Sequence, residues 1–229
     1  MKTVSKDTVK KAFTATIPVM TGYLVLAIGF GILLKTKGYG AGWSIAMSGF
    51  IYAGSMQYLT IDLLCGGASL ITTAVTTLMV NARHLFYGIS MVERYQDTGK
   101  KKPYLMFALT DETYSLVCSE ESVKDIKEPK EYYFLVSLFN QSYWVAGSVI
   151  GSLLGNIIPF NVEGIDFALT ALFVTIFVEQ WLTAKNHIPA LVGVISSVVC
   201  LLIFGADSFL IPTMMIIVVL LIWQKSKLE

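Results

Sequence analysis

Long, nearly uncharged apolar stretches limit the folds that this chain can adopt. An α-helix needs about 20 mostly apolar residues to cross the hydrocarbon core of a bilayer. Seven stretches approach or exceed that length, at residues 12–34, 41–64, 68–92, 132–158, 165–184, 188–205 and 208–224. We therefore expect an all-α, polytopic integral membrane bundle of about seven transmembrane helices. Residues 103–119 form a shorter segment, which we expect to be a short span, a re-entrant helix or an interfacial helix.

The composition suits a lipid environment. Apolar residues make up 55% of the chain and charged residues 14%, and the mean hydropathy is +0.65. Water-soluble domains average about 45–50% apolar and about 25% charged residues. The net charge of +1 gives no reason to expect a nucleic-acid partner. Because no linker is long enough to separate two domains, we expect one multi-pass transmembrane domain over residues 1–229.

A weak internal repeat suggests two halves, at about residues 12–119 and 132–229. The sequence QYLT at 57–60 recurs 123 residues later as QWLT at 180–183. The spans before these two sequences are both rich in glycine, with GYLVLAIGFG at 22–31 and AGSVIGSLLG at 146–155. Transporters are often built from such repeats. The alternative is chance similarity between apolar helices.

The charged loops give conflicting signals about orientation. Lys and Arg in short loops normally mark the cytoplasmic side. If the N-terminal lysines are inside, three full crossings place Lys100–Lys102 outside. If residues 93–102 are inside and 103–119 is re-entrant, the N-terminal lysines fall outside instead. We expect a cytoplasmic C-terminus and leave the orientation of the N-terminus open.

The most informative polar cluster within an apolar stretch is Asn81-Ala82-Arg83-His84. Arg83 lies about nine residues from the polar end of its span, which is ~14 Å and near the membrane midplane. Its planar guanidinium matches a carboxylate, and His84 titrates near neutral pH and can carry a proton. Asn81 and Arg83 lie about 200° apart on a regular helix, so they face one cavity only if the helix is broken. The alternative is that Arg83 snorkels and His84 is a satisfied core residue.

Two further groups are candidates for binding a substrate. Asp111 and Glu112 are adjacent carboxylates in an apolar segment, where they can pair with Arg83, bind an ammonium group or relay protons. Their alternative place is the lipid headgroup region. Ser55 and Gln57 follow a stretch rich in small residues that lets a helix unwind or pack closely. They offer neutral hydrogen bonds to a ligand, with ordinary helix packing as the alternative.

These sequences together resemble the AzlC-type family of branched-chain amino-acid permeases. The resemblance extends from about residue 13 to the end of the chain. It rests on Gly29-Phe30-Gly31, MSGFIYAGSMQ at 47–57, NARHLFYG at 81–88, LTDETY at 109–114 and FALTALFV at 167–174. Family members more often carry Leu where this chain has Ala82, which is a change of one apolar residue for another.

The resemblance implies an exporter of hydrophobic amino acids in a bacterial inner membrane. Its substrates would be leucine, isoleucine or valine, with methionine as a further candidate. It also implies a partner, a small hydrophobic AzlD-type subunit. We expect Arg83 or the N-terminus of a half-helix to bind the substrate carboxylate and Asp111 or Glu112 to bind its ammonium. Met56 and Phe86 would line an apolar pocket, and His84 or a carboxylate would couple export to protons.

Three other functions remain open on the sequence alone. The chain can be a passive channel for a small solute, or a structural subunit whose partner forms the path. A membrane-embedded enzyme that uses Asp111, Glu112 and His84 is the third. Two histidines and three widely spaced cysteines do not suggest a metal site, and no GxxxxGK[ST] loop for ATP is present. We expect no metal, no cofactor and no catalytic activity.

Overall fold

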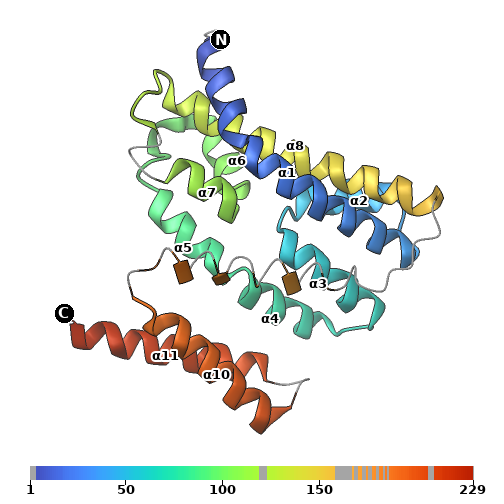
Figure 1. Cartoon of the computed structure of the whole chain (residues 1–229), viewed down its shortest axis with the longest axis vertical. Helices are drawn as coiled ribbons and strands as arrows, with labels where there is room; N and C mark the ends of the chain where they lie inside the picture. The colour runs from blue at the N-terminus through green and yellow to red at the C-terminus, as the bar shows by residue number, and fades with distance from the viewer. Residues whose placement is uncertain are drawn as a thin grey trace. The chain divides into compact units, whose positions relative to one another are not determined.

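The computed structural model describes residues 4–118, 123–157, 186–205 and 209–228, with scattered residues between 167 and 184 (Figure 1). The described residues form helices joined by turns and short connections, so the predicted all-α class is confirmed for them. The chain divides into two compact units, Met1–Leu169 and Thr170–Glu229, and each is described by itself. Nothing tests the predicted single transporter domain, which stays a prediction.

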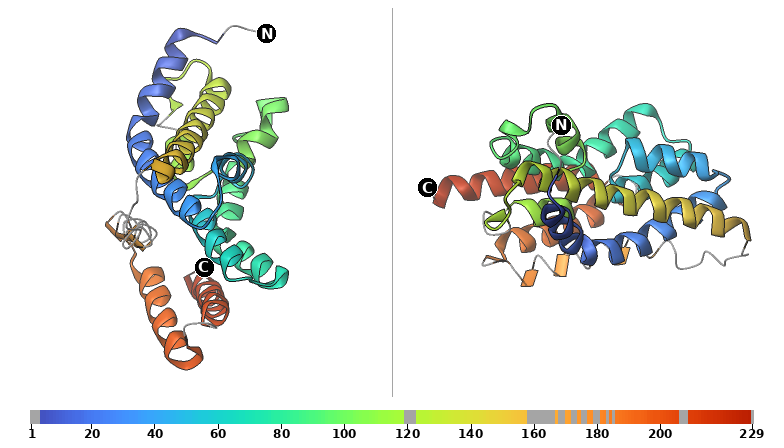
Figure 2. Two further views of the ribbon diagram at one scale, coloured as in Figure 1. Left: turned by 90° about the vertical axis from the view of Figure 1, so that its right-hand side faces the viewer. Right: turned by 90° about the horizontal axis from the view of Figure 1, so that it is seen from above.

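Two long helices run through the first unit. Helix α1 spans Lys6–Thr36, and the side chain of Ser5 caps it by accepting a hydrogen bond from Thr8 N at 3.2 Å. Helix α8 spans Pro129–Ile157 and starts at a proline, which suits the first turn of a helix. The two helices run side by side and in the same direction, as both views of Figure 2 show.

Glycines let α1 and α8 approach each other to backbone contact. A Cβ atom at Gly31 would lie 2.1 Å from the carbonyl oxygen of Ser148, and one at Gly151 would lie 2.1 Å from that of Ile28. Both distances are far below van der Waals contact, so only glycine fits at either position. This close approach of small residues is typical of helix pairs in membranes.

The register of this pair bears on the internal repeat. Gly151 approaches Ile28, and Gly155 lies against Ile32, so facing residues are 123 residues apart. The same offset relates the two sequences QYLT and QWLT. This agreement supports the repeat, which stays a prediction because Gln180 and Thr183 lie outside the described residues.

The second predicted span is two helices that turn back on each other. Helix α2 spans Ala41–Phe50 and α3 spans Gly54–Cys65, with Tyr52 between them at φ 43°. Ser48 near the end of α2 donates to Ser148 at 2.9 Å. After the turn, Tyr58 of α3 donates to the Leu26 carbonyl at 2.7 Å. The pair forms a hairpin that enters and leaves at the end of the unit where α1 finishes.

The third predicted span is broken too, at Asn81. Helix α4 spans Leu70–Val80 and α5 spans Ala82–Met91, and Asn81 between them adopts φ −91° and ψ 3°. The chain then forms the 3₁₀ helix η1, Gln96–Lys101. Unlike α2 and α3, the broken helix α4–α5 continues from one end of the unit towards the other.

The doubtful segment 103–119 forms a second hairpin. Helix α6 spans Lys102–Phe107 and α7 spans Asp111–Val117, separated by a break at residues 108–110. Phe107 at this break packs against Tyr52 at the break between α2 and α3, with ring centroids 6.3 Å apart. The tips of two hairpins that enter from opposite ends therefore meet inside the unit.

Charged contacts gather the hydrophilic segments at one end of the unit, here called the charged end. Glu128 accepts hydrogen bonds from Ser5 N at 3.0 Å and from the Thr8 hydroxyl at 2.9 Å. Further contacts here join Lys11 Nζ to the Asp125 carbonyl (2.9 Å), Lys101 to Glu131, and Lys130 to Asp97 (3.9 Å). The start of α1 and both charged loops thus lie together. The sequence alone did not show whether these segments are on the same side.

The second unit contains α10, Ile188–Phe204, and α11, Leu210–Leu228. Most of the predicted span 165–184 lies outside the described residues. Of the described helices, only α1 combines a length of at least 18 residues with enough hydropathy, 2.2 in its best window, to cross a bilayer. The count of seven spans stays a prediction. Residues 41–64 and 68–92 are not continuous helices, because their breaks leave halves of 10 to 12 residues.

Candidate functional site

The break at Asn81 places Arg83 at the centre of the first unit. Asn81 ends α4 and also precedes the first residue of α5, so the side chains on either side of it no longer follow one regular helix. The sequence required such a break for Asn81 and Arg83 to face one space, and the structure contains it. Broken helices in transporters commonly expose backbone and side-chain groups to a substrate.

Arg83 joins three elements that are distant in the sequence. One guanidinium nitrogen, Nη1, forms an ion pair with Asp111 at the start of α7. The other, Nη2, donates to the Ser55 hydroxyl at the start of α3, at 2.9 Å. Of the two carboxylates that we considered as partners for Arg83, Asp111 makes the contact. Both side chains remain partly accessible, at 28% for Arg83 and 21% for Asp111.

This ion pair leaves polar atoms without a partner among the described residues. Arg83 Nε and Asp111 Oδ1 are buried and make no hydrogen bond there, and the same holds for Asn81 Oδ1 and His84 Nδ1. Buried polar groups in native proteins are nearly always paired, so unpaired ones call for a missing partner. The pair thus leaves one donor and one acceptor without a partner, which a ligand with both an anionic and a cationic group can satisfy.

Glu112 points to a different set of partners. Its Oε2 accepts a hydrogen bond from the Tyr23 hydroxyl of α1 at 2.7 Å. Tyr23 also lies 2.7 Å from the Thr110 hydroxyl, which is 3.1 Å from that of Thr113. Asn140 of α8 donates to Thr113 at 3.0 Å and closes this chain of contacts. Asp111 and Glu112 are neighbours in sequence but belong to separate polar clusters.

Gln57 has its amide occupied by the protein itself. Its Oε1 accepts from the Trp144 indole at 2.8 Å, and its Nε2 donates to the Ser48 hydroxyl at 3.2 Å. Gln57 and Ser48 are both fully buried. The structure therefore places Gln57 as a link between α3, α2 and α8, while Ser55 reaches Arg83.

The two residues expected to line an apolar pocket differ in exposure. Met56 of α3 is buried, at 2% exposure, whereas the Phe86 side chain of α5 is 71% exposed. His84 packs edge-on against Tyr87, with ring centroids 6.1 Å apart, and does not contact Asp111.

Sequence reasoning missed three residues of the site. Tyr23 is one aromatic residue in an apolar helix, and its contact with Glu112 joins positions 89 residues apart. Tyr52 is buried with its hydroxyl unpaired among the described residues and with a positive φ, which is strained for a residue other than glycine. Thr110 carried the one available signal, since a threonine before two acidic residues is a typical helix cap.

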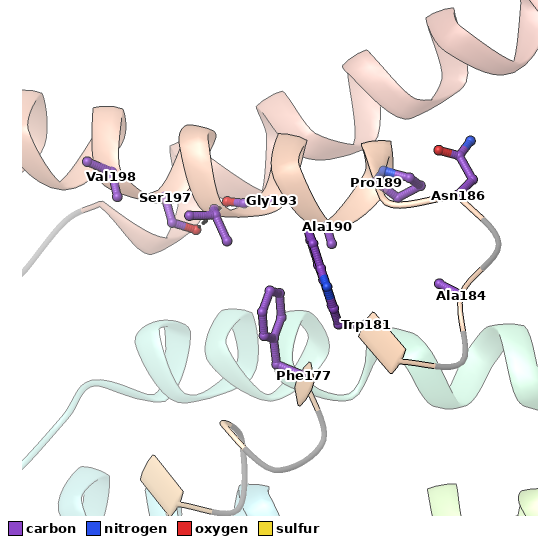
Figure 3. Close-up of a pocket in the computed structure, with 10 residues that line it drawn as sticks. Phe177, Trp181, Ala184, Asn186, Pro189, Ala190, Gly193, Ser197 and Val198 are labelled. Atoms are coloured by element: carbon purple, nitrogen blue, oxygen red, sulfur yellow. Dashed lines mark hydrogen bonds between the residues drawn. The ribbon is translucent and has the colours of Figure 1, made fainter. Parts of the chain in front are cut away.

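The second unit has a separate hollow of about 640 Å³. Figure 3 shows Phe177 and Trp181 on one side of it, facing the first turns of α10 with Pro189 and Ala190. Two polar groups that line it have partners within the chain: Asn186 Oδ1 accepts from Ile188 N at 2.9 Å, and the Ser197 hydroxyl donates to the Gly193 carbonyl at 2.8 Å. We assign no function to this hollow.

Comparison with known proteins decides the family. The profile described as AzlC protein matches residues 18–158, which include both hairpins and the Arg83–Asp111 pair. The chain belongs to the AzlC family. The resemblance seen in the sequence is thereby confirmed.

Full-length relatives extend this match over nearly all of the chain. The branched-chain amino acid transport protein AzlC of Bacillus subtilis is 43% identical over 220 residues, which cover 96% of this chain and 86% of the relative. A membrane protein of Haemophilus influenzae is 40% identical and covers 97% of this chain and 91% of its own length. The inner membrane protein YgaZ of Escherichia coli is 28% identical over 80% of this chain. No solved structure matches the chain.

Membership of the AzlC family settles the broad class of the protein. Its relatives are named as membrane and transport proteins, so this chain is a membrane protein of a family that transports amino acids. The relative in Bacillus subtilis is named as a transport protein, and the absence of catalytic activity stays a prediction.

Proposed function

We propose that this protein exports branched-chain or other hydrophobic amino acids across the bacterial inner membrane. The observation that carries the proposal is the Arg83–Asp111 pair at two chain breaks, with Arg83 Nε and Asp111 Oδ1 both unpaired among the described residues. A zwitterionic amino acid presents the two groups that complete these contacts. The name of the Bacillus subtilis relative supports the choice of substrate.

Recognition of the substrate follows from the two open atoms. The substrate carboxylate accepts from the free Nε–H of Arg83, whose planar fork is suited to carboxylates. The ammonium group donates to Asp111 Oδ1. Because the ion pair is itself neutral, a neutral zwitterion binds without adding net charge at the centre of the membrane. The side chain of the substrate then selects by apolar contact, which tolerates leucine, isoleucine and valine alike.

The fold suggests how the first unit lies in the membrane. We propose that α1, α8 and the broken helix α4–α5 cross it, and that the hairpins α2–α3 and α6–α7 re-enter from opposite faces. The meeting of Tyr52 and Phe107 at the hairpin tips supports this arrangement. Non-helical backbone is tolerated at this depth where it is enclosed by protein or lines a cavity. Each hairpin can then open the substrate site to one side.

The charged end assigns an orientation under the same proposal. Lysines of the N-terminal helix and of the first loop gather there, and both groups obey the positive-inside rule only if this end is cytoplasmic. This arrangement removes the conflict seen in the sequence. Residues 103–119 leave from the charged end and return to it, which favours the re-entrant alternative over a short span.

We expect cysteine labelling to place the N-terminus and the first charged loop on the same side. Lys10→Cys and Lys100→Cys should react with a membrane-impermeant maleimide only after spheroplasts are permeabilised. Lys37→Cys, at the other end of α1, should react in intact spheroplasts. The native thiols Cys65, Cys118 and Cys200 are first replaced by alanine. Labelling of Lys10→Cys and Lys100→Cys from opposite sides would refute this topology.

A small AzlD-type subunit completes the proposed transporter. Apolar side chains on α5, including Leu85, Phe86 and Ile89, are 60–71% exposed within this chain. Lipid or a partner helix must cover such a surface, since water does not tolerate it. This surface is compatible with a partner subunit and does not by itself identify one.

Export from whole cells tests the proposed function. Cells without their own exporters are fed dipeptides, and the release of leucine, isoleucine, valine and methionine is measured with and without the two chains. We expect release of one or more of these amino acids only when this chain and the small subunit are both present. If none of the four is released with both chains confirmed in the membrane, the proposed substrate class is wrong.

A further inference from the structure

Glu112 is a carboxylate that the proposed binding of the zwitterion leaves unused. Among the described residues, no Lys, Arg or His lies within ion-pair distance of it, in contrast with the neighbouring Asp111. Its contacts are to hydroxyl groups instead. We propose that Glu112 is the site at which this transporter binds the proton that it exchanges for an amino acid. This inference rests on the proposed function and adds the coupling ion to it.

The depth of Glu112 fits such a role. Its partner Tyr23 lies on α1 twelve residues after Lys11 and twelve residues before Lys35. At 1.5 Å per residue, Tyr23 is about 18 Å from each of these cations along the helix. The hydrocarbon core is about 30 Å thick, so Glu112 sits close to its middle. A carboxylate there is costly when ionised and is typical of a proton site in pumps and transporters.

A count of hydrogens shows that the surroundings accept both protonation states of Glu112. Three contacts link Glu112 to Tyr23, Tyr23 to Thr110, and Thr110 to Thr113, at 2.7, 2.7 and 3.1 Å. They need three hydrogens, and the hydroxyls of Tyr23 and Thr110 supply one each. Thr110 donates to Thr113, so all three contacts are filled when Glu112 is protonated and donates to Tyr23. When Glu112 is ionised, Tyr23 donates to it and Thr110 turns its hydrogen from Thr113 to Tyr23. Hydroxyl groups can reverse direction in this way because each is both donor and acceptor.

Asn140 fixes the far end of this chain of hydroxyls. Its Nδ2 donates to Thr113 at 3.0 Å and has no hydroxyl hydrogen to reverse. The Thr113 hydroxyl oxygen therefore keeps a donor from Asn140 when Thr110 turns its hydrogen to Tyr23. A change in the protonation of Glu112 is thus accommodated by rotation of the Tyr23 and Thr110 hydroxyl groups.

The groups around Glu112 come from several elements. Tyr23 faces it from α1, Tyr52 from the break between α2 and α3, and His84 and Tyr87 from α5. Asp111 adjoins it on α7 and is neutralised by Arg83. Helix α8 contributes the uncharged Asn140. The Tyr52 hydroxyl is buried and makes no hydrogen bond among the described residues.

The exchange moves one proton inward for each neutral amino acid moved outward, so each cycle carries one positive charge into the cell. The ionised carboxylate takes up one proton when the site faces outward, and the neutral acid releases that proton when the site faces the cytoplasm. The amino acid travels the opposite way, bound at Arg83 and Asp111. No covalent bond to the substrate forms or breaks, and the inward proton gradient drives the outward movement of the substrate.

The test uses proteoliposomes that contain this chain together with the small subunit. Counterflow of radiolabelled leucine is measured at equal pH, and a pH-sensitive dye inside the vesicles reports proton movement when leucine is added outside. For Glu112→Gln we expect the leucine-driven pH change to fall at least about tenfold, while counterflow slows no more than about fivefold. Glu112→Asp keeps a titratable group and should retain the pH change.

Each other outcome has a definite meaning. A leucine-driven pH change that persists in Glu112→Gln would overturn the inference. So would wild-type counterflow without any pH change, although the proposed function would then stand. Loss of counterflow in correctly inserted Glu112→Gln would overturn it too, because Glu112 would then serve the substrate. Absence of counterflow in the wild-type protein would instead contradict the proposed function.

Discussion

Replacement of Arg83 by lysine is expected to reduce export at least about 100-fold without preventing insertion into the membrane. Lysine keeps the positive charge and can still pair with Asp111. It cannot contact Asp111 and Ser55 through one planar fork while a third nitrogen remains free for the substrate. The initial rate of leucine release, divided by the amount of protein in the membrane, measures the effect.

Two further variants separate binding from folding. Arg83→Ala leaves Asp111 as an unpaired, partly accessible charge, so the loss of stability should be smaller than the about 3–5 kcal/mol that loss of one partner of a buried pair costs. We therefore expect less folded protein as well as no export. The exchange Arg83→Asp with Asp111→Arg restores a pair and should recover folding but not transport, because the free donor and acceptor change places. Arg94→Lys, in the charged loop, is the matched control and should export normally. Undiminished export by Arg83→Lys would refute the assigned role.

Replacement of Gly31 by alanine should have the largest effect on stability. The added Cβ would lie 2.1 Å from the Ser148 carbonyl oxygen and 2.6 Å from Ser152 N, both of which are backbone atoms. Such atoms cannot move aside as a flexible side chain can, so α1 and α8 must separate. We expect a loss of about 3 kcal/mol, which lowers the melting temperature of a domain of this size by ~10 °C.

Gly22 on the same helix provides the matched control. A Cβ atom there has nothing within 4 Å, so Gly22→Ala adds helix propensity of up to about 1 kcal/mol without a clash. Thermal melting of both variants in detergent, followed by the loss of monodisperse protein, makes the comparison. If Gly31→Ala has the same melting temperature as the wild-type protein, the close contact between α1 and α8 is not a feature of the folded state.

The sequence identified the candidate residues whose charge is unusual in an apolar segment. Arg83, Asp111 and Glu112 stood out because charge is rare in apolar segments. The need for a break near Asn81 followed from helix geometry. Gln57 has a partner within the protein that the sequence could not show, because Trp144 lies 87 residues away and no local pattern joins the two. Tyr23 could not be found for the same reason.

Orientation and topology needed contacts between distant segments. Apolar length alone suggested that residues 41–64 and 68–92 each cross the bilayer as one helix. The turn at Tyr52 reverses the first of them, and only its packing against α1 and α8 shows this. The contacts of Glu128 with the start of α1 likewise lie 120 and 123 residues apart. Hydropathy does not show whether the chain reverses or continues after a break in a helix.

The most direct test of the account is competition for leucine counterflow in the same proteoliposomes. Unlabelled isoleucine is compared with leucinamide, which lacks the carboxylate, and with 4-methylpentanoate, which lacks the ammonium group. If Arg83 and Asp111 together bind the zwitterion, isoleucine should compete with leucine. Each analogue should need a concentration at least about 100-fold higher than isoleucine for the same inhibition, because a site built for a polar group rejects ligands without it. Equal competition by either analogue, or uptake of leucine that neither saturates nor shows counterflow, would contradict the account.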